Sequence, residues 1–234
     1  MILRVLHSFL LYLIALLSFL VAFAMILCLM PFSKDRIKLF QTAAHLWVRF
    51  AALFSGVKVI TSGLENIPRN KAAIFVANHQ SAMDIPILIA YLPTHFRFVA
   101  KKELFKIPLF GWGVRQAGHI SIDRESILSS YKTLEKIVQM LKAGASVIFF
   151  PEGTRSWDGS LGKFKRGSLM AALKSGAPII PIAISGSYNI MPRDTKLIRP
   201  GRVKLSIGKP IYIKDEKEYN RKLEEVREAI SKML

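Results

Sequence analysis

An unbroken apolar stretch opens the chain. No Asp, Glu, Lys or Arg occurs between Val5 and Ser33. The stretch exceeds the roughly 20 residues that a helix needs to cross a bilayer, and Pro31 predicts its end. It is also longer than the apolar core of a secretory signal, roughly 7–15 residues, and no small-x-small cleavage site follows it. The pattern therefore predicts a membrane-associated helix.

A second helix is predicted directly after the first. Apolar side chains recur there at steps of three and four, with polar residues between them. They are Leu39, Ala43, Leu46, Trp47, Phe50 and Phe54. Such a stripe suits packing on the first helix or lying in the membrane interface. We predict that residues 1–56 form a two-helix membrane-anchoring segment. The pattern leaves open whether it spans the bilayer or dips into one leaflet.

The pattern changes at residue 57, where short strand-like runs begin to alternate with helical stretches. The predicted strands are 72–79, 96–100, 119–124, 145–150, 178–184 and an extended run over 203–213. The predicted helices are 85–92, 127–141, 168–176 and 219–233. This alternation indicates that residues 57–234 form an α/β domain with a mixed, largely buried β-sheet flanked by helices. In such folds, functional loops lie at the carboxyl ends of strands.

Charge separates the two parts of the chain further. The formal net charge is +18, and Arg4 is the only charged residue before Lys34. A basic body suits nucleic acid, an anionic membrane surface or an anionic substrate, and the apolar N-terminal segment favours the last two. A membrane-tethered nucleic-acid-binding protein remains a remote alternative, because the basic residues are dispersed. The basic run 34–38 after the first helix predicts that the body is cytoplasmic.

Two motifs carry candidate chemistry. The run NHQSAMD (78–84) follows a predicted strand, and a turn there permits contact between His79 and Asp84. Such a pair can serve as a general base with its orienting carboxylate. Alternatively, Asp84 caps the next helix and His79 is a structural loop residue. The second motif, FFPEGTRS (149–156), offers Gly153, Thr154 and Arg155 as a phosphate site, or it is a polar turn with a Glu152–Arg155 ion pair.

Further cations are candidates for the same phosphate. The run AKKELFKIPLFGWG (100–113) combines Lys101 with apolar side chains that suit an acyl slot, the membrane or the core. Arg124 is a phosphate ligand or a partner of Asp123, and His119 is interpreted as structural. A nucleotide-binding glycine loop, a zinc motif and a serine-nucleophile elbow are all missing from the sequence. The single cysteine, Cys28, permits no intrachain disulfide or paired-cysteine metal site.

Taken in order, NHQSAMD, HISIDR, FPEGTRS and IPIAISG resemble the motifs of the glycerolipid acyltransferase superfamily, in its bacterial 1-acylglycerol-3-phosphate acyltransferase branch. The resemblance covers about residues 57–212, and HISIDR is the loosest match. It implies that His79 is the general base and that Asp84 orients it. It also implies a phosphate-binding set for the acceptor. This set comprises Lys101, Arg124, Glu152, Gly153, Thr154 and Arg155, with Glu152 organising the loop.

The resemblance implies transfer of an acyl group from a thioester to the sn-2 hydroxyl of lysophosphatidic acid, which gives phosphatidic acid. The donor is acyl carrier protein or coenzyme A thioester, and no metal or other cofactor is required. The expected location is the inner membrane, with the catalytic domain on its cytoplasmic face. The alternative within this class is another lysophospholipid or an amphiphilic alcohol as acceptor.

Overall fold

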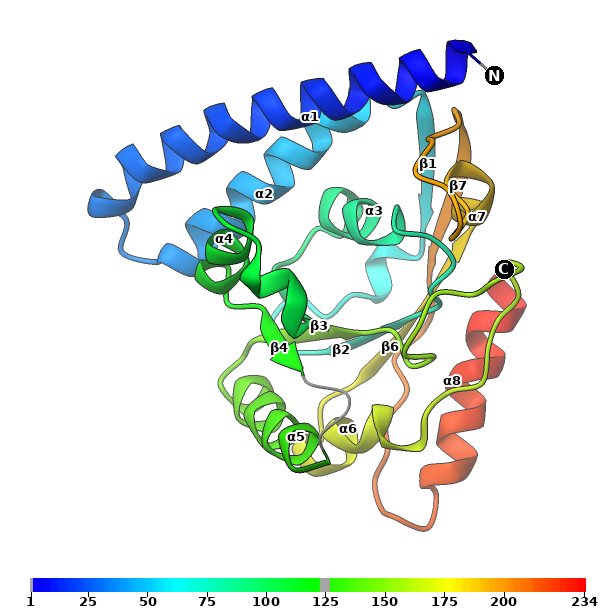
Figure 1. The fold of residues 1–234 in the computed structure, drawn as a ribbon. Coiled ribbons are helices and arrows are strands. Elements are labelled where there is room, and N and C mark those ends of the chain that lie inside the picture. Colours follow the sequence, from blue (N-terminus) through cyan, green and yellow to red (C-terminus); the bar gives the residue numbers. More distant parts are fainter. Residues whose placement is uncertain (1, 123–126) are drawn as a thin grey trace.

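The computed structural model describes residues 2–122 and 127–234, and its ribbon has helices on both sides of one sheet (Figure 1). The strands are β1 (Val57–Ser62), β2 (Ile74–Ala77), β3 (Phe96–Lys101), β4 (Ile120–Ile122), β5 (Ser146–Phe149), β6 (Ile179–Ser185) and β7 (Gly201–Ile207). The α-helices are α1 (Ile2–Leu29), α2 (Arg36–Leu53), α3 (Asp84–Tyr91), α4 (Phe110–Gln116), α5 (Ile127–Lys142), α6 (Met170–Ser175), α7 (Ser187–Ile190) and α8 (Tyr219–Met233).

The seven strands form one mixed sheet in the order β1-β7-β6-β2-β5-β3-β4. Strands β6 and β7 pair antiparallel, and the other neighbouring pairs are parallel. This arrangement confirms the predicted α/β class with a mixed, helix-flanked sheet. The central strand β2 is buried at every position. Because β2 and β5 run parallel side by side, their carboxyl ends meet at one edge of the sheet.

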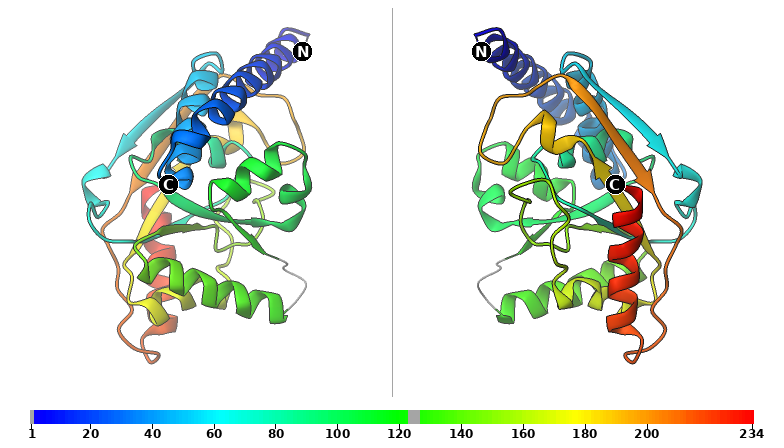
Figure 2. Two further views of the ribbon diagram at one scale, coloured as in Figure 1. Left: turned by 90° about the vertical axis from the view of Figure 1, so that its left-hand side faces the viewer. Right: turned by 90° about the vertical axis from the view of Figure 1, so that its right-hand side faces the viewer.

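The two faces of the sheet are covered by different helices. Alternate side chains of a strand point to opposite faces, so Phe75 and Ile74 belong to different core clusters. Helix α3 packs in the cluster of Phe75, to which α1 adds Leu11. Helices α5, α6 and α8 pack in the cluster of Ile74. Figure 2 shows the same division, with α1 and α2 on one side of the sheet and α5 and α8 on the other.

The N-terminal helices pack on each other and on the body. The indole nitrogen of Trp47 in α2 donates to the carbonyl of Ala15 in α1 at 3.1 Å. The first half of α1 is also tied to the segment after α7. There the hydroxyl of Tyr12 donates to the Lys196 carbonyl at 2.5 Å, and the Ile198 amide donates to the Ser8 hydroxyl at 2.9 Å. Within the described residues, only 2–32 form a helical stretch long and apolar enough to cross a membrane.

Several element boundaries differ from the predicted ones. The predicted helix 168–176 consists of a 3₁₀ turn over Arg166–Leu169 and then α6. It ends at Gly176, whose φ of 71° lies in the left-handed region that glycine adopts at helix ends. The predicted extended run 203–213 is strand only to Ile207, after which Ile211 makes an isolated bridge to Ile179. Strands β2 and β5 are each shorter than predicted, and β1, α4 and α7 were not predicted.

Candidate active site

The two motifs with candidate chemistry meet at the carboxyl edge of the sheet. His79 follows β2, and residues 150–156 follow the neighbouring strand β5. The backbone joins them, because the Ser156 amide donates to the His79 carbonyl at 2.8 Å. Sites in open α/β sheets form at this edge because adjacent parallel strands release their loops there. The sheet topology thus brings together segments that lie about 70 residues apart in the sequence.

His79 and Asp84 form a hydrogen-bonded pair. The Nδ1 atom of His79 lies 2.8 Å from Oδ2 of Asp84, whose side chain is fully buried. The same oxygen accepts the backbone N–H groups of Gln80 and Ser81, each at 2.8 Å. Three donors therefore fix the carboxylate. With Nδ1–H directed at Asp84, the neutral imidazole presents the Nε2 lone pair for proton transfer.

The alternative role of Asp84 as the cap of the following helix is wrong. Helix α3 begins at Asp84 itself, and its N-cap is Met83, which makes no side-chain capping bond. The carboxylate instead turns back over the preceding loop, toward Gln80 and Ser81. Asp84 therefore closes the tight loop that precedes the helix and holds the imidazole of His79.

An aromatic ring fixes the plane of the imidazole. Phe150 stacks on His79 with ring centroids 4.0 Å apart and an interplanar angle of 20°. Offset or parallel stacking of this kind restricts rotation of the histidine ring. Phe150 was not predicted as a site residue, because a phenylalanine at the end of a buried strand usually belongs to the core.

Glu152 links the two motifs through backbone atoms. Its Oε1 accepts the His79 amide at 2.8 Å, and its Oε2 accepts the Gly162 amide at 3.0 Å. Burial raises the pKa of the Glu152 carboxyl, and these two hydrogen bonds oppose the rise. Among the described residues Glu152 and Arg155 form no ion pair, so the polar-turn alternative does not describe this loop. Both oxygens of Glu152 bind the protein itself, which supports its loop-organising role.

We predict that Glu152→Gln loosens this loop. Glutamine has one acceptor oxygen, so its NH₂ group would face either the His79 or the Gly162 amide. The unpaired donor should lower the free energy of unfolding by about 1–3 kcal/mol. Displacement of the His79 backbone should lower kcat roughly tenfold. Denaturation in detergent and steady-state assays measure the two effects, with exposed Glu135→Gln as the control. Wild-type values for both would contradict the linking role.

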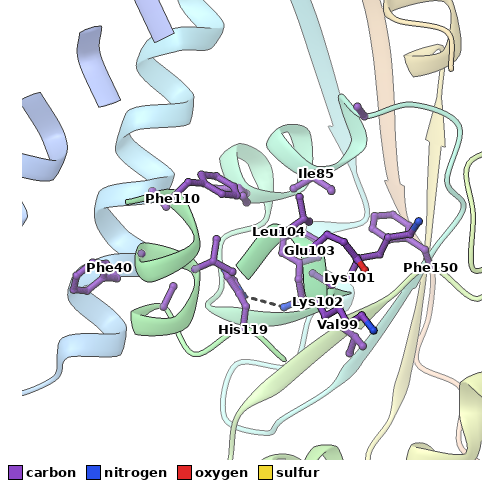
Figure 3. Close-up of a pocket in the computed structure, with 18 of the residues that line it drawn as sticks. Phe40, Ile85, Val99, Lys101, Lys102, Glu103, Leu104, Phe110, His119 and Phe150 are labelled. Carbon is purple, nitrogen blue, oxygen red and sulfur yellow. Dashed lines mark hydrogen bonds between the residues drawn. The ribbon is translucent and has the colours of Figure 1, made fainter. Parts of the chain in front are cut away.

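A cavity of about 690 Å³ adjoins the pair. His79, Gly153, Thr154 and Arg155 line it together with Lys101 and Arg193. Apolar side chains from the N-terminal helices line it as well, among them Phe19 and Phe23 of α1 and Phe40 and Trp47 of α2. Figure 3 shows Phe40 and Phe110 well separated from Lys101 and Phe150 along the lining. A space with cations by the imidazole and hydrocarbon elsewhere suits an amphiphilic ligand.

The apolar run after Lys101 divides between the predicted roles. Leu104 and Phe110 line the cavity. Trp112 packs edge-on against Phe40 at 5.3 Å between ring centroids, which places it in the core between α2 and α4. Phe105 is buried, whereas Ile107 and Leu109 are exposed. One segment therefore contributes to the acyl slot, the core and the exposed apolar surface.

The predicted cations are only partly brought together. Lys101 and Arg155 both line the cavity, and Arg124 lies outside the described residues. Two cations that the sequence motifs do not include lie nearby. Lys165 crosses Gly153 so closely that a Cβ on this glycine, whose φ is 75°, would lie 2.6 Å from the lysine Cε. Arg193 donates from Nη1 to the Arg155 carbonyl at 2.7 Å. The 150–166 loop thus needs glycine at position 153.

His119 makes the contacts expected of a structural residue, and its ring also lines the cavity. Its Nδ1 accepts the Phe98 amide at 3.1 Å, so the ring is held neutral between two strands. Burial, and next the charge of Arg97, lower its pKa from 6.5 to about 4. His7 and His45 bind backbone carbonyls of Phe54 and Ile89, which also agrees with packing roles. Among the described residues, no cluster of three His, Cys, Asp or Glu side chains is arranged to hold a metal ion.

We predict an acid-sensitive contribution to stability from His119. Between pH 6.5 and about 4 the ring binds a proton in the unfolded chain but not in the folded one. Its contribution is therefore complete above pH 6.5 and is lost as the pH falls through this window, by about 3 kcal/mol in total. His119→Gln keeps an acceptor for the Phe98 amide but does not titrate. Denaturation curves across the window should fall less steeply for the variant, and parallel curves would contradict the assignment.

Comparison with known proteins places the chain among acyltransferases. A family model described as Acyltransferase matches residues 58–185. The chain is 38% identical over 183 residues to a chloroplastic 1-acyl-sn-glycerol-3-phosphate acyltransferase of Arabidopsis thaliana, covering 77% of this chain and 51% of that protein. It is 35% identical over 176 residues to the enzyme of that name from Pseudomonas aeruginosa, covering 73% and 67%. The chain thus spans about half the length of the plant relative.

The fold is also that of a solved structure. The crystal structure of the 1-acyl-sn-glycerophosphate acyltransferase PlsC from Thermotoga maritima matches with a TM-score of 0.84 and 31% sequence identity. The match covers 99% of this chain and 97% of that one, so it includes the N-terminal helices as well as the sheet.

Proposed function

This chain belongs to the acyltransferase family, and we propose that it is a 1-acyl-sn-glycerol-3-phosphate acyltransferase that forms phosphatidic acid. The observation that carries the proposal is the His79–Asp84 pair, 2.8 Å apart, beside an amphiphilic cavity lined by Arg155 and by apolar helices. The acceptor's free hydroxyl matches His79, its phosphate matches Arg155, and its acyl chain matches the apolar side chains of the N-terminal helices.

The proposed reaction is direct transfer. Nε2 of His79 removes the proton of the sn-2 hydroxyl as its oxygen attacks the thioester carbonyl. Asp84 stabilises the imidazolium that forms. The tetrahedral intermediate then expels the thiolate as the C–S bond breaks, and the imidazolium returns the proton to the sulfur. The products are phosphatidic acid and the free thiol of coenzyme A or acyl carrier protein. The reaction needs no acyl-enzyme, metal or redox cofactor.

The proposed location is the cytoplasmic face of the inner membrane. Residues 1–56 would anchor the chain, and residues 57–234 would form the catalytic domain. The apolar face of α1 and the basic run 34–38 support this arrangement. A basic body is attracted to anionic lipid by roughly 1 kcal/mol for each Lys or Arg near the surface. The same charge suits coenzyme A and acyl carrier protein, since both are anionic.

Product analysis with the purified protein in lipid vesicles tests the proposal. Lysophosphatidate should be acylated in preference to lysophosphatidylcholine, lysophosphatidylethanolamine and monoacylglycerol, with acyl-CoA and acyl-ACP each supplied as donor. An equal or higher rate on another lysolipid would favour the alternative acceptor. Absence of acyl transfer with both donors would refute the activity.

We predict a selective effect of Arg155→Ala. If Arg155 binds the acceptor phosphate, loss of its charge-assisted hydrogen bonds should raise KM for lysophosphatidate by roughly 10- to 100-fold. The KM for the acyl donor should change little. Steady-state kinetics with each substrate varied in turn measures the two constants. An effect confined to the donor would reverse the assignment of this loop.

A further inference from the structure

We propose that Arg193 is a second phosphate-binding arginine of the cavity, held in place by Trp157. The inference rests on the proposed function, since it assigns a substrate contact within the same site. Arg193 lies in the turn after α7, beyond the residues 58–185 that match the family model. It was not among the residues that the sequence motifs identified.

Contacts of Arg193 place it at the polar end of the cavity. Its side chain lines the cavity that His79 and Arg155 also line. Its Nη1 donates to the backbone carbonyl of Arg155 at 2.7 Å, which holds the two arginines in adjacent positions. A residue that only closed a surface turn would not line the space beside the imidazole.

Trp157 provides a platform for the guanidinium. The Cζ atom of Arg193 lies 3.7 Å from the indole centroid, a close cation–π contact. The indole is 71% exposed, and the Trp157 carbonyl accepts the Tyr188 hydroxyl at 2.9 Å. Stacking uses the face of the guanidinium and leaves its N–H groups, which lie in the plane, available to a ligand. The exposed indole therefore orients the arginine without occupying its donors.

Arg155 and Arg193 have no acidic partners at this end of the cavity among the described residues. Neither Arg155 nor Arg193 forms an ion pair with any carboxylate in the described part of the chain. The carboxylates of Asp84 and Glu152 are occupied by the imidazole and by backbone amides. Glu103 also lines the cavity but forms no ion pair with either arginine. Beyond Nη1, the N–H groups of Arg193 donate to no residue that the structure describes. Two arginines that line one cavity without acidic partners among the described residues match a phosphate dianion, for which bidentate arginine contacts are favourable.

The phosphate has two possible sources. One is the phosphomonoester of lysophosphatidate, and the other is a phosphate of the acyl donor. Steady-state kinetics of Arg193→Gln distinguishes them, with lysophosphatidate, acyl-CoA and acyl-dephospho-CoA each varied. Exposed Arg199→Gln in the same segment is the matched control, because its side chain does not line the cavity.

Loss of the phosphate contact should raise the KM of one substrate by roughly 10- to 100-fold, with kcat changed by less than about threefold. A rise for lysophosphatidate assigns Arg193 to the acceptor. A rise for acyl-CoA that is absent for acyl-dephospho-CoA assigns it to the donor. Arg193→Lys keeps the charge and should recover part of the affinity. Equal losses of kcat for every substrate, without recovery by lysine, would show that Arg193 only braces the loop and would overturn the proposal.

A binding measurement separates this inference from the proposed function. Octyl phosphate has the phosphomonoester but no hydroxyl to acylate, and octanol is its uncharged control. Calorimetric titration should show octyl phosphate binding at least about tenfold more weakly to Arg193→Gln than to wild type. If lysophosphatidate is not acylated but this difference holds, the proposed function fails and the inference stands. Equal binding of octyl phosphate to both proteins, together with an unchanged KM for acyl-CoA, overturns the inference.

Discussion

Replacement of His79 by alanine is expected to lower kcat by roughly 10³- to 10⁴-fold. A positioned general base contributes about this much to proton transfer, and no other histidine among the described residues has a carboxylate partner. The imidazole is fixed by Asp84 at Nδ1 and by the stacked ring of Phe150, so alanine removes the catalytic group without removing either support. Initial rates with saturating lysophosphatidate and acyl donor measure the loss.

The fold should survive this change. The His79 side chain is 15% exposed, and the backbone contacts of residue 79 with Glu152 and Ser156 do not use the imidazole. Vesicle association and the apparent Tm should therefore stay close to wild type. His95→Ala is the matched control, since His95 binds Thr42 outside the cavity. Turnover by His79→Ala within a few fold of wild type would refute the general-base role.

Replacement of Asp84 by asparagine is expected to lower kcat by roughly 10²- to 10³-fold with little change in KM. The amide oxygen can keep the three donors that Oδ2 accepts, and the NH₂ group can take the position of Oδ1, which has no partner. The substitution therefore removes the negative charge that stabilises the imidazolium while it preserves the loop. The same rate assay measures the effect.

A second substitution distinguishes the catalytic effect of the Asp84 charge from its effect on the stability of the loop. Asp84→Ala leaves the buried amides of Gln80 and Ser81 without an acceptor, so it should also lower the free energy of unfolding by about 2–4 kcal/mol. If the asparagine variant keeps its stability and loses activity, the charge is catalytic. If both variants lose stability and activity in proportion, Asp84 serves the fold alone.

The alternation of strand and helix patterns predicted the fold class because the sheet is buried by helices on both faces. Runs such as residues 147–150 are then apolar throughout, and the segments between the strands show helical periodicity. The strand order was not predictable, since β7 inserts between β1 and β6 through pairings far apart in sequence. Strand β1 was not predicted because exposed Ile60 interrupts the alternation of apolar and polar residues, and α7 was not predicted because it is a single turn.

Within the site, local contacts were predictable and distant ones were not. The contact between His79 and Asp84 was predictable because the two residues are only five positions apart and a single turn can join them. The bond from the His79 amide to Glu152 joins residues 73 apart, and nothing in either motif indicates it. Arg193 was missed for the same reason, because its partner Arg155 lies 38 residues earlier. The phosphate-binding set and the division of the chain at residue 56 remain predictions.

The N-terminal helices contribute side chains to the cavity wall, and this bears on how a lipid substrate would reach the cavity. Phe19 and Phe23 come from α1, and Phe40 and Trp47 come from α2, so the helices of the proposed anchor form part of the cavity wall. Under the proposed function, a lysolipid held by these side chains would enter from its own leaflet without crossing bulk water. The quantity that saturates such an enzyme is the mole fraction of lysolipid in the membrane, a concentration in two dimensions. Removal of residues 1–56 would therefore remove part of the cavity wall, in addition to any loss of membrane association.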